Sequence, residues 1–496
     1  MFQKVMPEQV GVSSSDIRKY VQYLESKKLV THSMVIMRHD KVIYENYWKP
    51  FNKDFKHRLY SDSKSYVALG IGFLVQEGLV DLDAPIVSYF DEEITKNASP
   101  LMKKQTVKEM LTMSTSYPLD KGFWFEYHYP DRLKAYFETS GSGKQNKGSG
   151  MLYDYDSWGS FVLCALIEVV TGKKFVDFMH EKLFSKIGVA ADTYALTCPG
   201  GHTWGDSAML VNAMDQAKVI LFTMKNGNWN GEQILDADYV KAATSKQVDN
   251  CSNGMYETSP NTFGYGYQIW RTRDNGFFFN GMGSQFAVAV PDKDMVFVIN
   301  SDNQGYEAPL TVIIDGFFEM IANKVDSDTL PEDKKAYDEL ICYSEGLELF
   351  YQRGPFQMEI AQKINGVEYA MQENPMGITK VKFTFNGDEG VFEYTNKQGD
   401  KKLPFGIGKN VFGKFPEEGY SDLLGNTFEP GNYYDCAASA RLEGNRISID
   451  VQIIDKYFGR AFMNFGFKGD EISIIMEKIC EDFCNEYQGW AYGKKA

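Results

Sequence analysis

The sequence lacks the features that place a chain in a membrane or send it out of the cell. It contains no run of about 18 uncharged apolar residues, the length needed to cross a bilayer as a helix. Its first residues, MFQKVMPEQVGVSSSDIRKY, hold no apolar segment of the kind found in secretory signal peptides. We therefore expect neither a membrane-spanning helix nor a secretory leader.

Positive charge is scarce as well. The chain has 52 Lys and Arg against 67 Asp and Glu, a formal net charge of −15. Surfaces that bind nucleic acid or anionic lipid need basic patches, so we expect no nucleic-acid partner and no membrane partner. A small molecule is the expected partner, and the sequence leaves homo-oligomerisation open.

Cysteine is infrequent and scattered, with seven residues in 496. No pair of CxxC motifs with zinc-site spacing is present, and the closest pair lacks further ligands at a suitable distance. We therefore expect no metal site, and reduced thiols in a cytoplasmic protein. The cysteines are Cys164, Cys198, Cys251, Cys342, Cys436, Cys480 and Cys484.

Several catalytic motifs are missing. There is no G-x-S-x-G, which disfavours an α/β-hydrolase, and no H-E-x-x-H, Walker loop or G-x-G-x-x-G after a strand. The six histidines leave a Ser-His-Asp triad open, although a lone histidine is more often structural. We expect His57 to pack locally.

The residues that are present predict a large globular core, because 43% are hydrophobic and 15% aromatic. Residues 14–28 read as an amphipathic helix, and residues 35–37 and 42–48 as a hairpin. From Gly264 onward, apolar and polar residues alternate as in successive strands. Residues 308–325 follow as an amphipathic helix. We expect an α/β (α+β) fold over residues 1–330, an antiparallel sheet flanked by helices, with a helical insert at about 80–245.

The remainder of the chain has a different pattern. The charged, proline-containing stretch VDSDTLPEDKKAYDE, residues 325–339, indicates a linker, which we place at 331–345. Residues 346–496 contain repeated hairpin signals, among them KFTFNGDEGVFEY and ASARLEGNRISIDV. We expect an all-β barrel or sandwich there, acting as a lid or an oligomerisation module without chemistry of its own.

The most informative stretch is HRLYSDSKSYVALGIGFLVQEG, residues 57–78. Ser61 and Lys64 stand three apart where an extended segment runs into a helix, so an amine can sit beside a hydroxyl. A serine with a base in contact is an activated nucleophile. Taken alone, S-x-x-K is a weak motif, equally consistent with a helix-capping serine and a solvated lysine.

The surrounding residues strengthen it. HRLYSDSKS followed by GFLVQEGLVDLDAPIVSYF resembles the nucleophile region of the serine hydrolases related to class C β-lactamases and penicillin-binding proteins. That resemblance implies a β-lactamase/transpeptidase-like fold, Ser61 as nucleophile and Lys64 as base.

The family's second motif is a tyrosine followed two places later by Asn or Ser. In LYDYDSWGSFVLCALIEVVTG both Tyr153 and Tyr155 are candidates, and the spacing to Glu168 favours Tyr155. The resemblance implies that Tyr155 relays a proton and that Ser157 bonds the lysine or the substrate. The alternative is a structural tyrosine in an aromatic cluster.

The third motif is a Lys/His-Thr-Gly triplet, replaced here by Gly281, Met282 and Gly283, followed by Ser284. Glycines let a backbone approach a ligand closely. The resemblance implies that the N–H groups of Ser284 and Ser61 form the oxyanion hole. A plain β-turn is the alternative.

Gly281 stands where β-lactamases and D-Ala carboxypeptidases keep a cation, so the branch of carboxylesterases and 6-aminohexanoate-dimer amidases fits better. His202, in the CPGGH segment, is a candidate substrate contact.

The resemblance implies cleavage of an ester or amide bond through an acyl-enzyme on Ser61, with neither metal nor organic cofactor. Acyl transfer by the same acyl-enzyme, a β-lactamase or D-aminopeptidase activity, and a catalytically silent binding protein are the alternatives. Intact Ser61, Lys64 and Tyr155 speak against the last.

Overall fold

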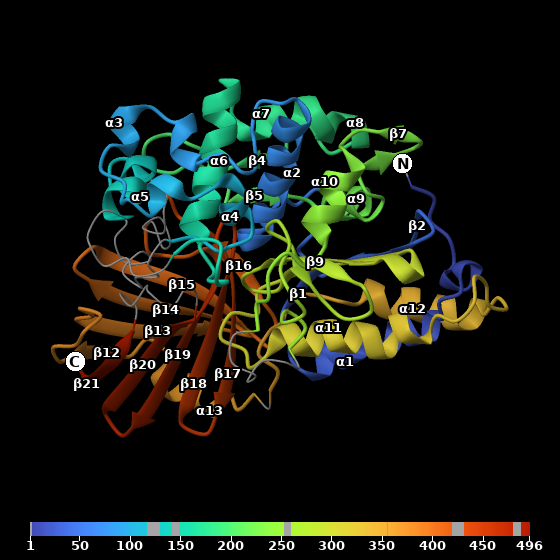
Figure 1. The fold of residues 1–496 in the computed structure, drawn as a ribbon. Helices are drawn as coiled ribbons and strands as arrows, with labels where there is room; N and C mark the ends of the chain where they lie inside the picture. The colour runs from blue at the N-terminus through green and yellow to red at the C-terminus, as the bar shows by residue number, and fades with distance from the viewer. Residues whose placement is uncertain are drawn as a thin grey trace. The chain divides into compact units, whose positions relative to one another are not determined.

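The computed structural model describes residues 2–116, 129–140, 148–251, 259–354, 356–418, 431–479 and 488–496 (Figure 1). The chain divides into two compact units, Met1–Glu348 and Leu349–Ala496. Among the helices of the described residues, none is long and apolar enough to cross a bilayer.

The first unit is built on a six-stranded antiparallel sheet in the order β2-β1-β11-β10-β9-β8. At the turn between β1 and β2, His39 and Asp40 both have left-handed backbones, with φ of 51° and 59°. Two such residues give a turn whose twist matches that of the strands it joins. The strands are β1 (Thr31–Arg38), β2 (Lys41–Tyr47), β8 (Trp270–Arg271), β9 (Phe277–Gly281), β10 (Gln285–Val290) and β11 (Met295–Ser301).

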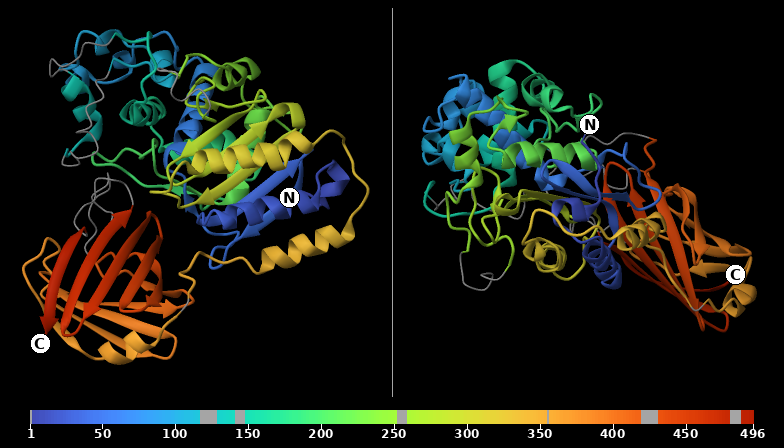
Figure 2. Two further views of the ribbon diagram at one scale, coloured as in Figure 1. Left: turned by 90° about the horizontal axis from the view of Figure 1, so that it is seen from below. Right: turned by 90° about the vertical axis from the view of Figure 1, so that its right-hand side faces the viewer.

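Both faces of this sheet are covered. On one face, α1 (Ser14–Ser26) and α11 (Pro309–Met320) lie side by side (Figures 1 and 2), and Phe317 stacks on Phe297 of β11 at a ring distance of 4.4 Å. On the other face, α9 (Ala213–Met224) packs against β1, β10 and β11. The strands β10 and β11 are therefore buried throughout, which explains their nearly continuous apolar sequence.

The helical insert lies between β2 and β8 in the chain and contains most of the remaining helices. Its α2 packs against α6, and this pair carries the candidate site described below. The helices are α2 (Ser63–Gln76), α3 (Glu92–Thr95), α4 (Val107–Leu111), α5 (Arg132–Ser140), α6 (Ser157–Thr171), α7 (Phe175–Met179), α8 (Ser185–Ile187) and α10 (Ala237–Thr244), with short strands β3 (His57–Arg58), β4 (Tyr194–Ala195), β5 (Met209–Val211), β6 (Asn228–Trp229) and β7 (Glu232–Gln233).

The predicted linker at 331–345 is wrong as a description of this segment. It contains helix α12 (Lys334–Glu345), which packs against α1 within the first unit. Leu340 is fully buried, and the Tyr44 hydroxyl lies 3.0 Å from Ser344 Oγ. The high charge of the segment suggested a linker, but a single apolar stripe is enough for an otherwise polar helix to pack against the rest of the unit.

The second unit is a closed barrel of nine strands. Antiparallel neighbours run from β15 through β14, β13, β12, β21, β20, β19 and β18 to β17, and a parallel contact between β15 and β17 closes the ring. β16 (Val411–Lys414) pairs with β17 outside the ring, and α13 (Glu359–Ile364) precedes the barrel. The ring strands are β12 (Glu368–Met371), β13 (Lys380–Asn386), β14 (Glu389–Asn396), β15 (Gly399–Ile407), β17 (Asp435–Glu443), β18 (Arg446–Ile454), β19 (Phe458–Lys468), β20 (Glu471–Ile479) and β21 (Gly489–Lys495).

The predicted fold class is confirmed in both parts. The antiparallel sheet with flanking helices and the helical insert are present, and the C-terminal region is an all-β barrel. Closure of the ring leaves few free strand edges, which is how β-barrels avoid pairing with other chains.

Candidate active site

Ser61 lies in a short 3-10 turn, Tyr60–Asp62, between β3 and α2. Tyr60 has a left-handed backbone with φ of 48°, a sparsely populated conformation for a residue other than glycine. Residues 57–60 and 62–74 are all buried, whereas Ser61 is only half-buried. The chain therefore presents this one serine from an otherwise enclosed segment.

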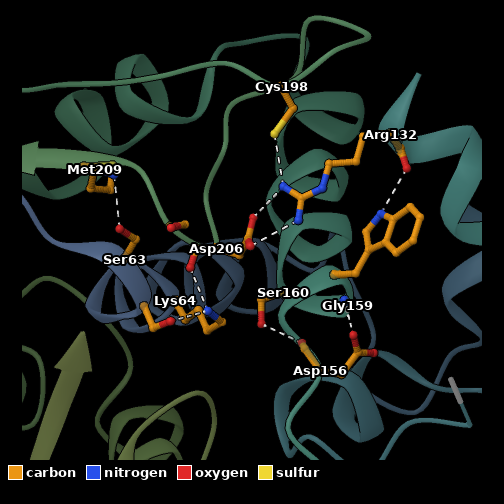
Figure 3. Close-up of polar contacts among 12 residues, drawn as sticks. Ser63, Lys64, Arg132, Asp156, Gly159, Ser160, Cys198, Asp206 and Met209 are labelled. Carbon is orange, nitrogen blue, oxygen red and sulfur yellow. Dashed lines mark hydrogen bonds and ion pairs between the residues drawn. The ribbon is translucent and has the colours of Figure 1, made fainter. Parts of the chain in front are cut away.

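Lys64 lies one turn further on and is 1% exposed. Its Nζ donates a hydrogen bond to Ser61 Oγ at 2.8 Å and another to the backbone carbonyl of Asp206 at 2.7 Å (Figure 3). Within the described residues, no carboxylate lies at ion-pair distance from this ammonium. The arrangement directs the amine at the serine hydroxyl.

Asp206 is itself held by a buried ion pair. Arg132 of α5 binds its carboxylate with two nitrogens, at 2.9 and 3.2 Å, and also donates to Cys198 Sγ at 3.1 Å. Trp158 Nε1 donates to the Arg132 carbonyl at 3.0 Å, which joins α5 to α6. Figure 3 shows this chain of contacts running from Cys198 to Lys64.

Cys198 is a neutral acceptor in this cluster. Burial raises the pKa of its thiol to about 12, even though Arg132 lies beside it. A thiol with so high a pKa is not a nucleophile at neutral pH.

Tyr155 is brought to the same place from a distant part of the chain. Lys64 Nζ lies 5.1 Å from the centre of its ring, a cation–π distance, and Trp270 stacks on the ring at 5.7 Å. Ser157 begins α6 and is buried. Asp156 caps this helix by accepting from the Gly159 N–H at 2.8 Å.

Tyr153 takes the other position that the sequence left open. Its ring packs against Tyr265 at 5.2 Å and against Trp270 at 6.0 Å. Its hydroxyl is buried without a hydrogen-bond partner in the described structure, and burial raises its pKa. Tyr153 therefore packs within an aromatic cluster that also contains Trp270 and Tyr265.

The turn from Gly281 to Ser284 joins β9 to β10 beside the serine. A Cβ on Gly281 would lie 2.0 Å from the Leu59 carbonyl oxygen, so only glycine lets β9 approach the segment before Ser61. Ser284 has a left-handed φ of 74° and is buried, and Met282 is 39% exposed. Gly283 also has a positive φ, of 78°.

Burial disfavours the charged form of two ionisable neighbours of Ser61. Burial lowers the pKa of His57 to about 3, and its ring nitrogens contact His32 at 2.8 Å and the Arg58 carbonyl at 2.9 Å. Burial raises the pKa of Asp62 well above its usual range, although Gln216 donates a hydrogen bond to it. His57 therefore packs locally.

His202 lies elsewhere. Its Nδ1 is 2.8 Å from Glu168, in the last turn of α6, and Thr203 also donates to this carboxylate. Burial raises the pKa of Glu168, but these hydrogen bonds outweigh it and lower the pKa overall. Glu168 is eleven residues beyond Ser157, about 16 Å along the helix at 1.5 Å per residue. The structure does not bring His202 to Lys64.

Sequence reasoning missed three residues that hold the site together. Asp206 and Arg132 belong to no motif, and only the fold shows that they meet. Gln268 joins three helices: its Nε2 donates to the Met110 carbonyl at 2.9 Å, its Oε1 accepts from Ser160 at 2.6 Å, and its carbonyl accepts from Ser65 at 2.7 Å. Gln268 has a left-handed backbone with φ of 56°, and nothing in the local sequence predicts this conformation for a glutamine.

No group of three or more potential metal-ligating side chains occurs in the part of the chain that the structure describes. The chemistry available at the site is that of an amine in contact with a hydroxyl. Such a pair can form and release a covalent acyl intermediate, provided that donors hold the oxyanion.

Comparison with known proteins agrees with this chemistry. The protein family described as beta-lactamase matches residues 17–312, well over half of the chain. An uncharacterized protein of Alkalihalophilus pseudofirmus is 25% identical over 253 residues, which are 46% of this chain and 68% of that protein. The 6-aminohexanoate-dimer hydrolase of Paenarthrobacter ureafaciens is 23% identical over 228 residues, 43% of this chain and little more than half, 56%, of the hydrolase.

Solved structures show the same fold. A Bacillus anthracis protein assigned as a 6-aminohexanoate-dimer hydrolase superposes with a TM-score of 0.54 at 20% identity, covering 67% of this chain and 89% of its own. A Bacteroides dorei protein assigned as a β-lactamase gives 0.50 at 15% identity, covering 60% and 96%.

Proposed function

Because this chain belongs to the beta-lactamase family of serine hydrolases, we propose that it cleaves an ester or amide bond of a small substrate through an acyl-enzyme on Ser61. The single observation that carries this proposal is the hydrogen bond of 2.8 Å between Lys64 Nζ and Ser61 Oγ. A buried amine without a counter-ion is costly to the fold, and an activating role for the serine hydroxyl accounts for its position.

In the proposed reaction, uncharged Lys64 takes the proton of Ser61 as Oγ attacks the substrate carbonyl carbon. The N–H groups of Ser61 and Ser284 hold the oxyanion, a contribution that is typically worth about a hundred- to a thousandfold in rate for each donor. The proton passes from Lys64, by way of the Tyr155 hydroxyl, to the leaving oxygen or nitrogen. Water then attacks the acyl carbon, the bond from this carbon to Ser61 Oγ breaks, and a proton of the water passes through Lys64 to Ser61 Oγ as the free acid leaves.

The expected substrate class follows from Gly281. A cation at this position would bind a substrate carboxylate, and glycine offers none. This supports a carboxylesterase or amidase more than a β-lactamase or a D-Ala peptidase. The resemblance to 6-aminohexanoate-dimer hydrolases points to the same branch.

Fluorophosphonate labelling of the full chain tests the nucleophile. Wild-type protein should be labelled and Ser61→Ala should not. Ser63→Ala is the matched control, because Ser63 is a buried serine two residues away that accepts from the Met209 N–H at 3.1 Å. An unlabelled wild-type chain would instead support a silent binding protein.

Intact mass after incubation with p-nitrophenyl acetate or nitrocefin tests the substrate class. We expect an acyl adduct with the ester and little with nitrocefin, and the reverse would indicate a β-lactamase. Adding an alcohol or amine acceptor separates hydrolysis from acyl transfer, because transfer yields a new ester or amide.

The remaining expectations stay predictions. Five cysteines of the described residues, Cys164, Cys198, Cys251, Cys342 and Cys436, are free of disulfides, while Cys480 and Cys484 lie outside those residues. We retain from the sequence the cytoplasmic location and the absence of a nucleic-acid partner as proposals.

A further inference from the structure

The barrel of the second unit contains a cavity of about 590 Å³. This volume falls within the range of small-molecule sites, and the mouth of a β-barrel is a common place for them. The described residues that line it all belong to the second unit.

The interior of the barrel changes character along its strands. Side chains two apart on a strand share a face, so successive inward residues can be followed from one end toward the other. At one end Phe383, Phe392 and Phe465 pack with ring centres 4.8 to 5.1 Å apart. Two residues further along each strand, the next inward side chain lines the cavity. The residue near the aromatic end and the cavity residue are, in that order, Tyr369 and Met371 on β12, Phe392 and Tyr394 on β14, Phe465 and Met463 on β19, and Ile474 and Met476 on β20.

Aromatic rings thus pack at one end of the barrel, and four methionines are among the residues that line the cavity: Met371, Met376, Met463 and Met476. Methionine is unbranched and polarizable, and it adapts to varied apolar ligands. Met463 and Met476 face each other across β19 and β20, and both are more than nine-tenths buried. The cavity accordingly has an apolar wall suited to an aliphatic chain.

A buried carboxylate provides a polar contact. Glu417 is 2% exposed, and its Oε1 accepts from the Tyr394 hydroxyl at 2.6 Å and from Asn396 at 2.9 Å. Its Oε2 lies 3.5 Å from Lys401 Nζ, longer than a charge-assisted hydrogen bond. A carboxylate oxygen has more than one acceptor site, so Oε2 can accept from a bound donor as well.

Charged and aromatic groups also belong to the wall. Glu373, Glu417, Glu477 and Lys397 are among the described residues that line the cavity. Lys401 lies beside Glu417, and the buried Lys478 lies two residues beyond Met476 on β20, opposite Ala461. The faces of Tyr394 and Phe415 in the wall also suit an ammonium group.

We infer that this cavity binds a small aliphatic primary amine, with its chain against Met371, Met463 and Met476 and its ammonium group directed to Glu417. The chain and the head are recognised by different parts of the wall, so their contributions can be measured separately.

Calorimetric titration of the full chain carrying Ser61→Ala tests the inference. Decylamine, decanol and decanoate have the same chain and differ in head charge, and each is used below its micellar concentration. We expect decylamine to bind in the micromolar range, decanol about tenfold more weakly, and decanoate more weakly still, since one charge-assisted hydrogen bond is worth about a tenfold change.

Variants locate the binding. Ala461→Phe places a ring in the cavity and should abolish binding of all three compounds. Glu417→Gln should weaken decylamine about tenfold and leave decanol unchanged. Glu443→Gln is the control, because Glu443 is exposed and lies outside this cavity.

Should Ala461→Phe or Glu417→Gln fail to fold, the double variant Glu373→Gln, Glu477→Gln keeps the test decisive. Both residues are exposed, and their loss should weaken decylamine about threefold but not decanol. Absence of decylamine binding, decanoate binding as tight as decylamine, or full binding by a folded Ala461→Phe chain each overturns the inference. None of these results bears on labelling of Ser61.

Discussion

Buried lysines of the two units are held in different ways, as Lys64 of the first unit and Lys401 of the barrel show. Lys401 of the barrel is 8% exposed and lies beside the Glu417 carboxylate. Lys64 of the first unit is 1% exposed, yet its contacts are a hydroxyl and a carbonyl. An ammonium group taken from water needs compensation, and neutral acceptors supply less of it than a carboxylate does.

The difference lies in the groups that each lysine contacts. At Lys64 the carboxylate of Asp206 faces away, toward Arg132, while its carbonyl faces the lysine. The amine is thereby oriented without being neutralised by an ion pair.

Replacing Lys64 provides the largest expected effect. Lys64→Met should lower kcat for p-nitrophenyl acetate about 10⁴-fold, the loss seen when a member of a nucleophile–base pair is removed. Its free energy of unfolding should change little, because methionine is an unbranched side chain that can fill much of the space of the buried lysine stem. Lys401→Met is the control and should retain full activity. A loss smaller than tenfold in Lys64→Met would remove Lys64 from the mechanism.

Arg132→Met should strongly destabilise the chain. It leaves the Asp206 carboxylate buried without its partner, at a cost of about 3–5 kcal/mol in urea unfolding. The double variant Arg132→Met, Asp206→Asn should recover part of this stability, since the buried charge is then absent. If the single and double variants unfold alike, the ion pair is not what holds the Asp206 carbonyl.

Tyr155→Phe should lower kcat about 10²–10³-fold while leaving unfolding nearly unchanged, because general acid–base groups contribute in that range. Tyr153→Phe is matched to it, two residues away in the same cluster. The Tyr153 hydroxyl has no partner in the described structure, so its removal should leave kcat intact. Equal losses in the two variants would mean that the phenol of Tyr155 has no special role.

Lys401→Met should reduce stability by about 2 kcal/mol, less than a fully broken buried pair, because Tyr394 and Asn396 continue to donate to Glu417. The double variant Lys401→Met, Glu417→Gln should be closer to wild type. Urea unfolding of the four proteins measures the coupling. An interaction energy near zero between Lys401 and Glu417 would mean that the carboxylate does not stabilise this lysine, in contradiction to the comparison with Lys64.

The smallest effect concerns pH. His57 stays neutral in the folded chain until about pH 3, whereas an unfolded histidine protonates near pH 6.5. Between these values the unfolded state binds more protons, so stability falls as the pH is lowered. His57→Gln should reduce the slope of unfolding free energy against pH in this window by up to about 1.4 kcal/mol per pH unit. An unchanged slope contradicts a neutral buried His57.

Local patterns predicted most of the elements correctly. The helix at 14–28, the hairpin of residues 35–37 and 42–48 and the helix at 308–325 correspond to α1, β1 with β2, and α11. Each depends on periodicity and turn residues within a few positions of one another. The segment at 331–345 failed because its docking against α1 involves residues about 300 positions away.

The candidate site divides in the same way. Contact between Ser61 and Lys64 follows from their spacing on one turn. The choice of Tyr155 over Tyr153, and of the turn at 281–284, came from resemblance to a family. The contact of His202 with Glu168 could not be predicted from the sequence, because a histidine after two glycines can have many different neighbours in a folded chain.

By itself the sequence determined the serine, the amine one helical turn away, the alternating strands of the barrel and the glycine that replaces a cation. Only the tertiary structure decided that the amine would meet the Asp206 carbonyl rather than a carboxylate, and that the barrel would be filled with rings at one end and left hollow at the other. Spacing along a helix or strand is a property of the local backbone, whereas the partner of a buried charge and the volume left inside a ring of strands depend on segments that meet only when the chain is folded.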